Sequence, residues 1–335
     1  MDGVEIAFLT PVMPEVRAAI AACAHADQHL HFADSEARQE QLALVRTAEA
    51  IVSAGSPVDA GLIAGSEKVR LIQKWGIGVD KIDLDAARAR GIPVAITAGA
   101  SAGPVAEHAL ALMLAVYRRL PLADRQIRAG IWQPGQLRVV CRQITGKTVG
   151  LLGFGNIARL LAHRLRGFDA EILYHDVRRA DAVTERGFGA RYVPFDTLLE
   201  QSDILSLHLP LTEQSRGIMN AAAFARMRQG AVLINTARGG LIDEAALHEA
   251  LLSGRLAGAG LDTFATEPVA ADHPLLALDQ VVVTPHSAGS VFDNIPNIAG
   301  HVLDNIARFA RGEPLSPADI IVPAGLPPAS AGAFP

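Results

Sequence analysis

The sequence predicts an α/β protein with two doubly wound parallel sheets. Its 335 residues are enough for about two domains, each able to bury a core of its own. Half of the residues are hydrophobic and only 19% are charged, which is a globular composition. Short β-rich runs also alternate with helix-like segments in two successive series. Because parallel strands need a helical crossover between them, this alternation indicates one parallel sheet for each series.

The first series occupies about the first hundred residues. Helix-like segments separate its short apolar runs, as expected for βαβ units. The predicted strands are residues 6–9, 50–53, 70–74 and 93–96, and the predicted helices are residues 14–24, 36–47 and 84–90.

The second series begins near Thr148. Its predicted strands are residues 148–153, 171–175, 204–207, 231–235, 258–261 and 281–284. Between the two series, residues 103–120 form a long apolar helix pattern with Pro104 near its first turn, where the missing N–H of proline costs least. The tail after Pro314 is rich in Pro and Ala and predicts an extended arm.

Composition and charge exclude several classes of partner. Lys and Arg number 30 against 35 Asp and Glu, so a net charge of -5 argues against a nucleic-acid surface. The longest apolar run, residues 109–117, is much shorter than the roughly 20 residues of a membrane span. The first residues lack the pattern of a signal peptide, and the 2 cysteines are too far apart for a metal or disulfide framework. We therefore expect a cytoplasmic protein without nucleic-acid or membrane partners.

A glycine-rich turn follows the first strand of the second series. Gly153, Gly155 and Ala158 form a Gly-x-Gly-x-x-Ala pattern between a predicted strand and a predicted helix. The first glycine allows a tight turn, the second lets the backbone approach a pyrophosphate, and the small alanine lets the helix pack closely. The helix N-terminus then faces the anion. The pattern predicts a dinucleotide site that includes Phe154, Asn156 and Ile157.

Asp176 ends the next predicted strand, about 20 residues beyond the turn, where a carboxylate accepts hydrogen bonds from ribose hydroxyls. Arg178 and Arg179 follow and would attract the 2′-phosphate of NADP, whereas Asp176 would repel it at short range. A solvated acid at a strand end is the plain alternative. The pattern favours NAD as cofactor over NADP.

Three further motifs follow later strands of the same series. They contain Arg238 in residues 234–239, Glu267 in residues 260–268 and His286 in residues 283–289. Taken singly, such residues are usually solvated or structural. Because the carboxyl ends of parallel strands meet at one edge, where ligands bind in open α/β sheets, we expect the three side chains to converge.

With these motifs the sequence resembles the D-isomer-specific 2-hydroxyacid dehydrogenases over nearly its whole length. The likeness extends to Lys-Trp-Gly-Ile-Gly-Val-Asp at residues 74–80, Val-Ala-Glu-His at 105–108 and His-Leu-Pro-Leu-Thr at 208–212. The resemblance implies a Rossmann-like NAD-binding domain, residues 99–288, inserted into a discontinuous flavodoxin-like substrate domain, residues 1–98 and 289–335. It also implies a homodimer built around the bridging helix region.

The resemblance implies that His286 is the acid/base, Glu267 its orienting carboxylate and Arg238 the clamp on the substrate's carboxylate and carbonyl. The chemistry agrees. Reduction of a 2-oxo acid carries a hydride to C2 while the carbonyl oxygen receives a proton, which histidine can donate near neutral pH. A neighbouring carboxylate favours the imidazolium, and the arginine fork holds a carboxylate by two hydrogen bonds.

Other roles also come from the resemblance. The backbone amides of the loop Gly76, Ile77, Gly78 and Val79 would bind the substrate carboxylate. Asp262 would hold the nicotinamide carboxamide, with a helix N-cap as the alternative. The remaining cofactor contacts implied in this way are His208, Pro210, Thr212, Thr236, Ala237, His286 and Gly289.

Substrate identity is left open between two neighbours in the sequence. Since successive residues of a strand face opposite sides, only one of Lys74 and Trp75 is expected to face the substrate. We favour Trp75, and with it an uncharged side group. Lys74 would instead recognise a distal phosphate or second carboxylate, as in 3-phosphoglycerate chemistry.

The chain departs from the family pattern at its first domain crossover. Residues 96–99 read Ile-Thr-Ala-Gly, where relatives usually have Asn-Thr-Pro-Gly, and Ser101 stands where a second Asn is common. This loop is expected to be the hinge between the two predicted domains. Two alternative functions stay open: oxidation of an acid such as formate or phosphite, and an NAD-responsive corepressor that keeps the whole fold.

Overall fold

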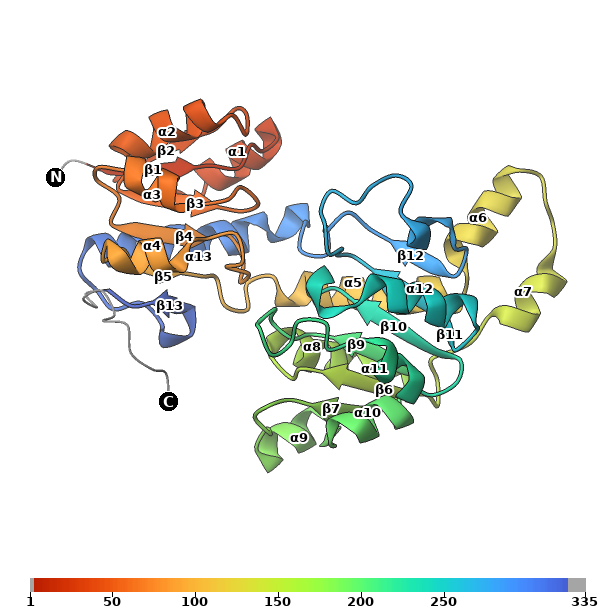
Figure 1. The fold of residues 1–335 in the computed structure, drawn as a ribbon. Coiled ribbons are helices and arrows are strands. Elements are labelled where there is room, and N and C mark those ends of the chain that lie inside the picture. Colours follow the sequence, from red (N-terminus) through yellow and green to blue (C-terminus); the bar gives the residue numbers. More distant parts are fainter. Residues whose placement is uncertain (1–2, 325–335) are drawn as a thin grey trace. The chain divides into compact units, whose positions relative to one another are not determined.

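The computed structural model describes residues 3–324 (Figure 1). The chain divides into two compact units. The first unit contains the residues up to Ser101 together with those from Val291 onward, and the second unit is Ala102–Ser290. The domain boundaries expected from the sequence follow residues 98 and 288. Each unit has its own sheet and its own cores.

The first unit contains a six-stranded sheet in the order β13-β5-β4-β3-β1-β2. Neighbouring strands are parallel except β13, which pairs antiparallel with β5 at the edge. The strands are β1 (Val4–Phe8), β2 (Gln28–Phe32), β3 (Ala50–Ser53), β4 (Leu71–Lys74), β5 (Val94–Ala95) and β13 (Ile320–Val322). The helices are α1 (Pro14–Ala21), α2 (Arg38–Thr47), α3 (Ala60–Gly65), α4 (Leu84–Ala89) and α13 (Ile295–Ala310), with short 3₁₀ turns η4 (Phe292–Asn294) and η5 (Pro317–Asp319).

Helices cover both faces of this sheet. Because side chains alternate along a strand, Ile6 and Phe8 of β1 pack with α1 and α13, while Ala7 packs with α2, α3 and α4. Strands buried on both faces read as continuous apolar runs, which is why β3 was recognisable in the sequence as residues 50–53.

Some elements of the first unit differ from the prediction. Neither β2 nor α3 was predicted. The Gln-His-Leu-His-Phe pattern of β2 is polar at alternate positions because β2 is an edge strand, and α3 is a six-residue helix that Asp59 caps. The tail after Pro314 is not wholly an extended arm, since Ile320–Val322 forms β13. The rest of that predicted arm lies outside the described residues.

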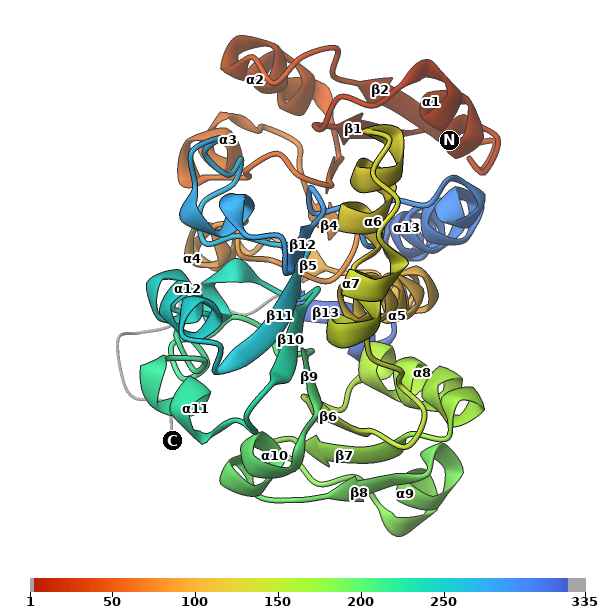
Figure 2. The same ribbon diagram turned by 90° about the vertical axis from the view of Figure 1, so that its right-hand side faces the viewer.

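The second unit contains a seven-stranded sheet, all parallel, in the order β12-β11-β10-β9-β6-β7-β8 (Figure 2). The strands are β6 (Thr148–Leu152), β7 (Glu171–His175), β8 (Ala190–Tyr192), β9 (Ile204–Leu207), β10 (Ala231–Asn235), β11 (Leu256–Leu261) and β12 (Val281–Val283). Only the short edge strand β8 was not predicted. With two α/β parallel-sheet units, the predicted fold class is confirmed, with the one antiparallel edge strand β13 as an addition.

Helices lie on both faces of the sheet of the second unit. The helices of this unit are α5 (Ala102–Tyr117), α6 (Leu120–Arg128), α7 (Pro134–Val140), α8 (Asn156–Leu165), α9 (Ala182–Phe188), α10 (Phe195–Gln201), α11 (Ala221–Arg226) and α12 (Glu244–Leu252), with 3₁₀ turns η1 (Arg166–Phe168), η2 (Gly239–Leu241) and η3 (Pro274–Ala277). Of these, α6 and α7 contain no buried residue. One core forms between the sheet and α5 and α8, and another between the sheet and α10, α11 and α12. No helix within residues 3–324 is long and apolar enough to span a membrane.

The predicted helix over residues 103–120 is α5, which packs closely on β11. A side chain at Gly258 or Gly260 would lie within about 3 Å of Val116 or Leu112, so glycine is required for this approach. The helix ends earlier than predicted, at Tyr117, because Arg119 adopts a left-handed conformation with φ 51°. The sheet order reverses between β6 and β9, so the turn after β6 lies at the topological switch point, where open α/β sheets bind ligands.

Candidate active site

The glycine-rich turn after β6 is shaped for close approach. Gly153 has φ 93°, and a Cβ there would lie 2.8 Å from the carbonyl oxygen of His208. At Gly155 a Cβ would meet no atom within 4 Å, and this residue begins α8 without a side-chain cap. Ala158 is fully buried in the core beneath the helix. The turn therefore presents the open N-terminus of α8 and its Asn156 and Ile157 amides to an anion.

Asp176 lies directly after β7 and is bound to this turn. Its Oδ2 accepts the N–H of Phe154 at 2.7 Å, and its Oδ1 accepts the N–H of Arg178 at 3.0 Å. Each carboxylate oxygen has a second lone pair for a further donor. Asp176 thus fixes the turn and keeps acceptors for a ligand hydroxyl.

Buried polar atoms without partners follow β9 and β10. Within residues 3–324, Nε2 of His208 and Oγ1 of Thr236 are enclosed and have no hydrogen-bond partner. Burial lowers the pKa of His208 to about 4, so the ring is neutral near neutral pH. Buried polar groups are normally paired, so two such atoms at the carboxyl edge of a sheet point to a polar ligand.

The loop after His208 satisfies its own polar groups. The hydroxyl of Ser215 donates to the carbonyl of Pro210 at 2.7 Å and accepts the N–H of Thr212 at 2.8 Å. Pro210 and Thr212, both predicted cofactor contacts, therefore lie in a compact turn whose shape Ser215 sets. No sequence motif pointed to this serine.

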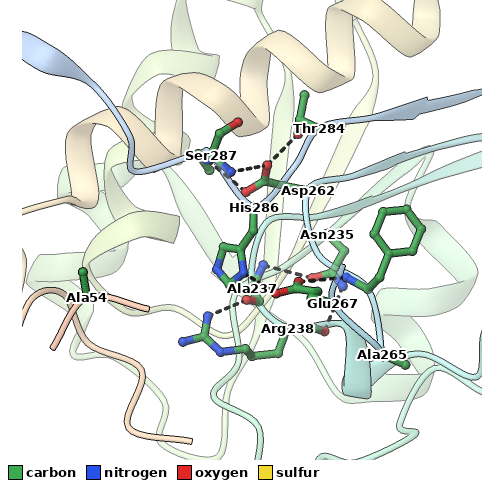
Figure 3. Close-up of polar contacts among 12 residues, drawn as sticks. Ala54, Asn235, Ala237, Arg238, Asp262, Ala265, Glu267, Thr284, His286 and Ser287 are labelled. Atoms are coloured by element: carbon green, nitrogen blue, oxygen red, sulfur yellow. Dashed lines mark hydrogen bonds and ion pairs between the residues drawn. The ribbon is translucent and has the colours of Figure 1, made fainter. Parts of the chain in front are cut away.

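His286 and Glu267 form a direct pair. Nδ1 of His286 lies 2.8 Å from Oε2 of Glu267, and Oε1 of Glu267 accepts the N–H of Phe264 at 3.1 Å. The His286 side chain is 45% exposed. Figure 3 shows His286, Glu267 and Arg238 gathered at one place after their strands, as the sequence predicted.

Arg238 is positioned by the turn that follows β10. Its Nη1 donates to the carbonyl of Ala237 at 2.7 Å. Asn235, which is fully buried, accepts the N–H of Ala237 and donates to the carbonyl of Arg238. A Cβ at Gly239 would overlap the backbone of Phe264, so only glycine lets this turn pack against the loop that carries Glu267. The sequence motif contained Asn235, but its role depends on contacts that only the folded turn provides.

Asp262 holds the loop that carries His286. Its Oδ1 accepts the hydroxyl of Thr284 at 2.6 Å and the N–H of Ser287 at 2.9 Å, and its Oδ2 accepts the N–H of Ala288 at 3.0 Å (Figure 3). The alternative of an N-cap is wrong, because η3, the next helical turn, begins only at Pro274 and His273 caps it. The loop continues into Gly289.

A histidine outside the predicted set also contacts this network. Nε2 of His108, on α5, lies 2.9 Å from the Thr284 hydroxyl and 3.6 Å from Oδ1 of Asp262. The Thr284 hydroxyl donates its single proton to Asp262. In the hydrogen bond between Thr284 and His108, Nε2 of His108 is therefore the donor. The sequence placed His108 in a family motif without a role.

In the first unit, the loop after β4 exposes backbone donors. Gly76 has φ 108°, and its N–H donates to the hydroxyl of Thr97 at 2.9 Å, so this amide is already engaged. Within residues 3–324, the N–H groups of Ile77, Gly78 and Val79 donate to no protein acceptor. These three amides, but not that of Gly76, are available to an anion.

The two residues before this loop are both engaged in the first unit. Lys74 is 8% exposed, and its ammonium donates to the carbonyl of Ser53 at 3.2 Å and to that of Ala54. Trp75 packs its edge against Phe8, with ring centroids 6.5 Å apart. Lys74 is thus held at the carboxyl end of β3.

Comparison with known proteins decides the family. Residues 110–288 match the model of the D-isomer specific 2-hydroxyacid dehydrogenase, NAD binding domain. The chain belongs to the D-isomer specific 2-hydroxyacid dehydrogenases. This member is 39% identical over 273 residues to a glyoxylate reductase of Korarchaeum cryptofilum, covering 80% of this chain and 82% of that protein.

Two further comparisons place this 2-hydroxyacid dehydrogenase among its relatives. It is 38% identical over 279 residues to the D-3-phosphoglycerate dehydrogenase of Archaeoglobus fulgidus, covering 83% of the chain but 52% of that protein, so the match spans about half of this relative. It also resembles an NAD-dependent formate dehydrogenase of Staphylococcus aureus solved with NAD, with a TM-score of 0.84, 27% identity, and coverage of 96% and 99% of the two chains.

The resemblance stated from sequence motifs is therefore confirmed, and the family is one of NAD-dependent dehydrogenases with NAD as cofactor. The residues of the second unit fit this cofactor. An open cradle beside Gly155, the carboxylate of Asp176 and the unpartnered atoms of His208 and Thr236 all lie at the carboxyl edge of one sheet. They offer amides to a pyrophosphate, an acceptor to a ribose and partners to further polar groups.

Proposed function

We propose that this dehydrogenase interconverts a D-2-hydroxy acid and the corresponding 2-oxo acid. The observation that carries the proposal is the pair of His286 and Glu267 beside Arg238. This set provides a proton donor, a carboxylate that orients it and a cation for the substrate carboxylate. NAD, when bound, supplies or accepts the hydride at C4 of its nicotinamide.

The contact with Glu267 fixes which nitrogen of His286 takes part. A carboxylate only accepts hydrogen bonds, so Nδ1 carries a proton and donates it to Oε2. Nε2 is then protonated in the imidazolium and bare in the neutral ring. In the reducing direction, Nε2–H gives its proton to the carbonyl oxygen as C2 is reduced, and the oxygen becomes a hydroxyl. In the oxidising direction, bare Nε2 removes that proton.

Arg238 is proposed to orient the substrate. The planar guanidinium of arginine can hold a carboxylate by two parallel hydrogen bonds. The amides of Ile77, Gly78 and Val79 are proposed as a second group for the substrate carboxylate. The proposed cofactor contacts are Gly153, Phe154, Gly155, Asn156, Ile157, Asp176, His208, Pro210, Thr212, Thr236, Ala237, Asp262, His286 and Gly289.

The proposed substrates are 2-oxo acids with an uncharged side group, such as glyoxylate, hydroxypyruvate or a larger apolar 2-oxo acid. The ammonium of Lys74 already donates hydrogen bonds to the carbonyls of Ser53 and Ala54, which argues against a role in binding a distal phosphate. The 39% identity to a glyoxylate reductase supports the same substrate class. Chemistry of the 3-phosphoglycerate type is the alternative.

The preference for NAD over NADP is proposed to rest on Asp176. Its carboxylate would accept from a ribose hydroxyl and repel a 2′-phosphate. Formate oxidation is less well supported, because formate has no hydroxyl proton for His286 and Glu267 to remove. A corepressor role would need no turnover, which gives a direct way to separate it from an enzyme.

The homodimer expected around the bridging helix region is proposed to form through α6 and α7 and the segment between them, which directly follow α5. This segment projects from the second unit (Figure 1) and exposes apolar side chains, with Trp132 79% exposed, Val139 73% and Ile127 54%. Exposed apolar groups concentrated in this way are typical of an interface. Light scattering should give twice the chain mass, and Ile127→Glu with Trp132→Ser should give the monomer mass. A monomeric wild-type protein would contradict the dimer.

The reaction is tested by a screen of NADH oxidation. Purified protein is mixed with NADH and with glyoxylate, hydroxypyruvate, pyruvate or bulkier 2-oxo acids, and with NAD and formate or 3-phosphoglycerate in the opposite direction. We expect turnover of a monoanionic 2-oxo acid to its D-hydroxy product, and its loss in His286→Asn. A protein that binds NADH but turns over none of these acids would overturn the proposal and favour a binding role.

A further inference from the structure

We propose that Glu185 strengthens the preference for NAD over NADP by occupying the guanidinium of Arg179, which would otherwise be available to a 2′-phosphate. The inference rests on the proposed NAD preference, and it concerns the two arginines that follow Asp176. From the sequence, either arginine was a candidate partner for NADP. The structure gives them different surroundings.

Arg179 is engaged by a carboxylate in the two-pronged geometry that it would use for a phosphate. Its Nε donates to Oε1 of Glu185 at 2.8 Å and its Nη2 donates to Oε2 at 3.0 Å. Its guanidinium carbon also lies 5.5 Å from the ring centroid of Tyr192. Because arginine recognises carboxylates and phosphates through the same fork, Glu185 competes directly with a phosphate for Arg179.

Arg178 differs from its neighbour. Its backbone N–H donates to Asp176, but in the described part of the chain its side chain takes part in no ion pair. It is exposed to solvent. Arg178 therefore serves as the natural comparison for Arg179.

Glu185 is itself held in place. It lies on α9, its side chain is only 14% exposed, and its Oε1 also accepts the hydroxyl of Tyr174 at 2.8 Å. Tyr174 is fully buried, and its oxygen accepts the N–H of Ala180 at 3.0 Å. The hydrogen bonds from Arg179 and Tyr174 lower the pKa of Glu185, and burial and the bond to Glu185 raise the pKa of Tyr174 to about 12. Near neutral pH the carboxylate is ionised and the phenol donates to it.

The same tyrosine connects Glu185 to the glycine-rich turn. The ring of Tyr174 stacks on that of Phe154 with centroids 4.0 Å apart, and the N–H of Phe154 donates to Asp176. The residues that shape the turn therefore also hold Glu185. Two features then favour NAD. The charge of Asp176 repels a 2′-phosphate, and Glu185 occupies the Arg179 guanidinium, which is then not available to that phosphate.

The test measures cofactor binding without turnover. Dissociation constants for NADH and NADPH are measured by fluorescence titration for the wild type, Glu185→Gln, Arg179→Ala and the double variant. Glu185→Gln should lower the Kd for NADPH about fivefold, the worth of one exposed ion pair, and leave the Kd for NADH within about twofold. The double variant should lose this gain, which separates a freed Arg179 from the mere removal of a negative charge.

Two single variants serve as controls. Arg179→Ala in the wild-type background should leave the Kd for NADPH unchanged, because Glu185 already binds the Arg179 guanidinium there. Arg178→Ala should raise the Kd for NADPH, because the side chain of Arg178 takes part in no ion pair in the described part of the chain and can bind the 2′-phosphate. Arg179→Ala leaves Glu185 and Tyr174 in place, so it tests the proposal even if Glu185→Gln fails to fold.

Three results would overturn the proposal. These are an unchanged ratio of the two Kd values in folded Glu185→Gln, a gain that persists in the double variant, and a loss of NADPH affinity in Arg179→Ala. The comparison between variants does not depend on whether a substrate is found. Failure of the proposed function is therefore distinguishable from failure of this inference.

Discussion

Nδ1 of His286 lies 2.8 Å from Oε2 of Glu267, while the other oxygen of Glu267 is held by the N–H of Phe264. The carboxylate is thus fixed from its far side before it orients the imidazole. The half-exposed ring is left with one nitrogen, Nε2, that can exchange a proton with a ligand. The first prediction follows from this arrangement.

Replacement of His286 by Asn should lower kcat about 10² to 10⁴-fold, because the proton donor is lost. NADH should still bind with a Kd within about threefold of the wild type. Glu267→Gln keeps the imidazole but weakens its orientation, so its loss of kcat should be smaller. Steady-state kinetics and fluorescence titration check both. Near wild-type turnover in His286→Asn would contradict the proton-transfer role.

Replacement of Asp176 should separate its two roles. Asp176→Ser removes the acceptor of the Phe154 N–H as well as the charge, so the Kd for NADH should rise about tenfold. The ratio of the Kd for NADPH to the Kd for NADH should fall. Asp176→Asn keeps an acceptor oxygen for the turn and should mainly relieve the repulsion of a 2′-phosphate. The assignment is wrong if wild-type enzyme has a higher kcat/KM with NADPH than with NADH.

Lys74→Ala is expected to affect stability more than catalysis. The buried ammonium donates to two backbone carbonyls, so its removal should cost about 1 to 3 kcal/mol of unfolding free energy, measured by denaturant titration. The kcat/KM for the best monoanionic substrate should stay within about threefold, since the charge makes little difference to its transition state. A large, selective loss with a phosphorylated or dicarboxylic substrate would instead support chemistry of the 3-phosphoglycerate type.

The enclosed imidazole nitrogen Nε2 of His208 should make the protein sensitive to acid. Its native pKa of about 4 lies below the value of about 6.5 in an unfolded chain, so between these pH values the unfolded state binds more protons. Stability is then retained above pH 6.5 and falls as the pH drops toward 4, by at most about 3 kcal/mol from this group. In His208→Gln the decline of Tm over this range should be shallower. Parallel Tm curves for the two proteins would contradict the buried, neutral ring.

The buried strands and the glycine-rich turn were predictable because their signals are local. The run Ala50–Ser53 is apolar on both faces, and Gly153 and Asp176 follow strands at the separation that a dinucleotide requires. By contrast, β2 is an edge strand with exposed histidines, and β13 is identifiable only by its pairing with β5.

The convergence of His286, Glu267 and Arg238, the proposed catalytic set, could be predicted from their order after the strands, but their supporting contacts could not. Asn235, Thr284 and His108 act through hydrogen bonds that join residues as far apart as 176 positions. Asp262 shows the same limit, because its hold on Ser287 and Ala288 depends on how two loops meet. A sequence gives the residue types at such positions but not which donors reach which oxygen.

The antiparallel pairing of β13 with β5 bears on the order in which the protein is completed during synthesis. Val322 pairs with Val94, and α13 packs over Ile6 and Phe8, so the first unit lacks an edge strand and a covering helix until residues near 322 have left the ribosome. All strands of the second unit end by Val283 and emerge earlier. The part of the chain made first is therefore finished last, and one face of its strands lacks the covering helix α13 during the interval.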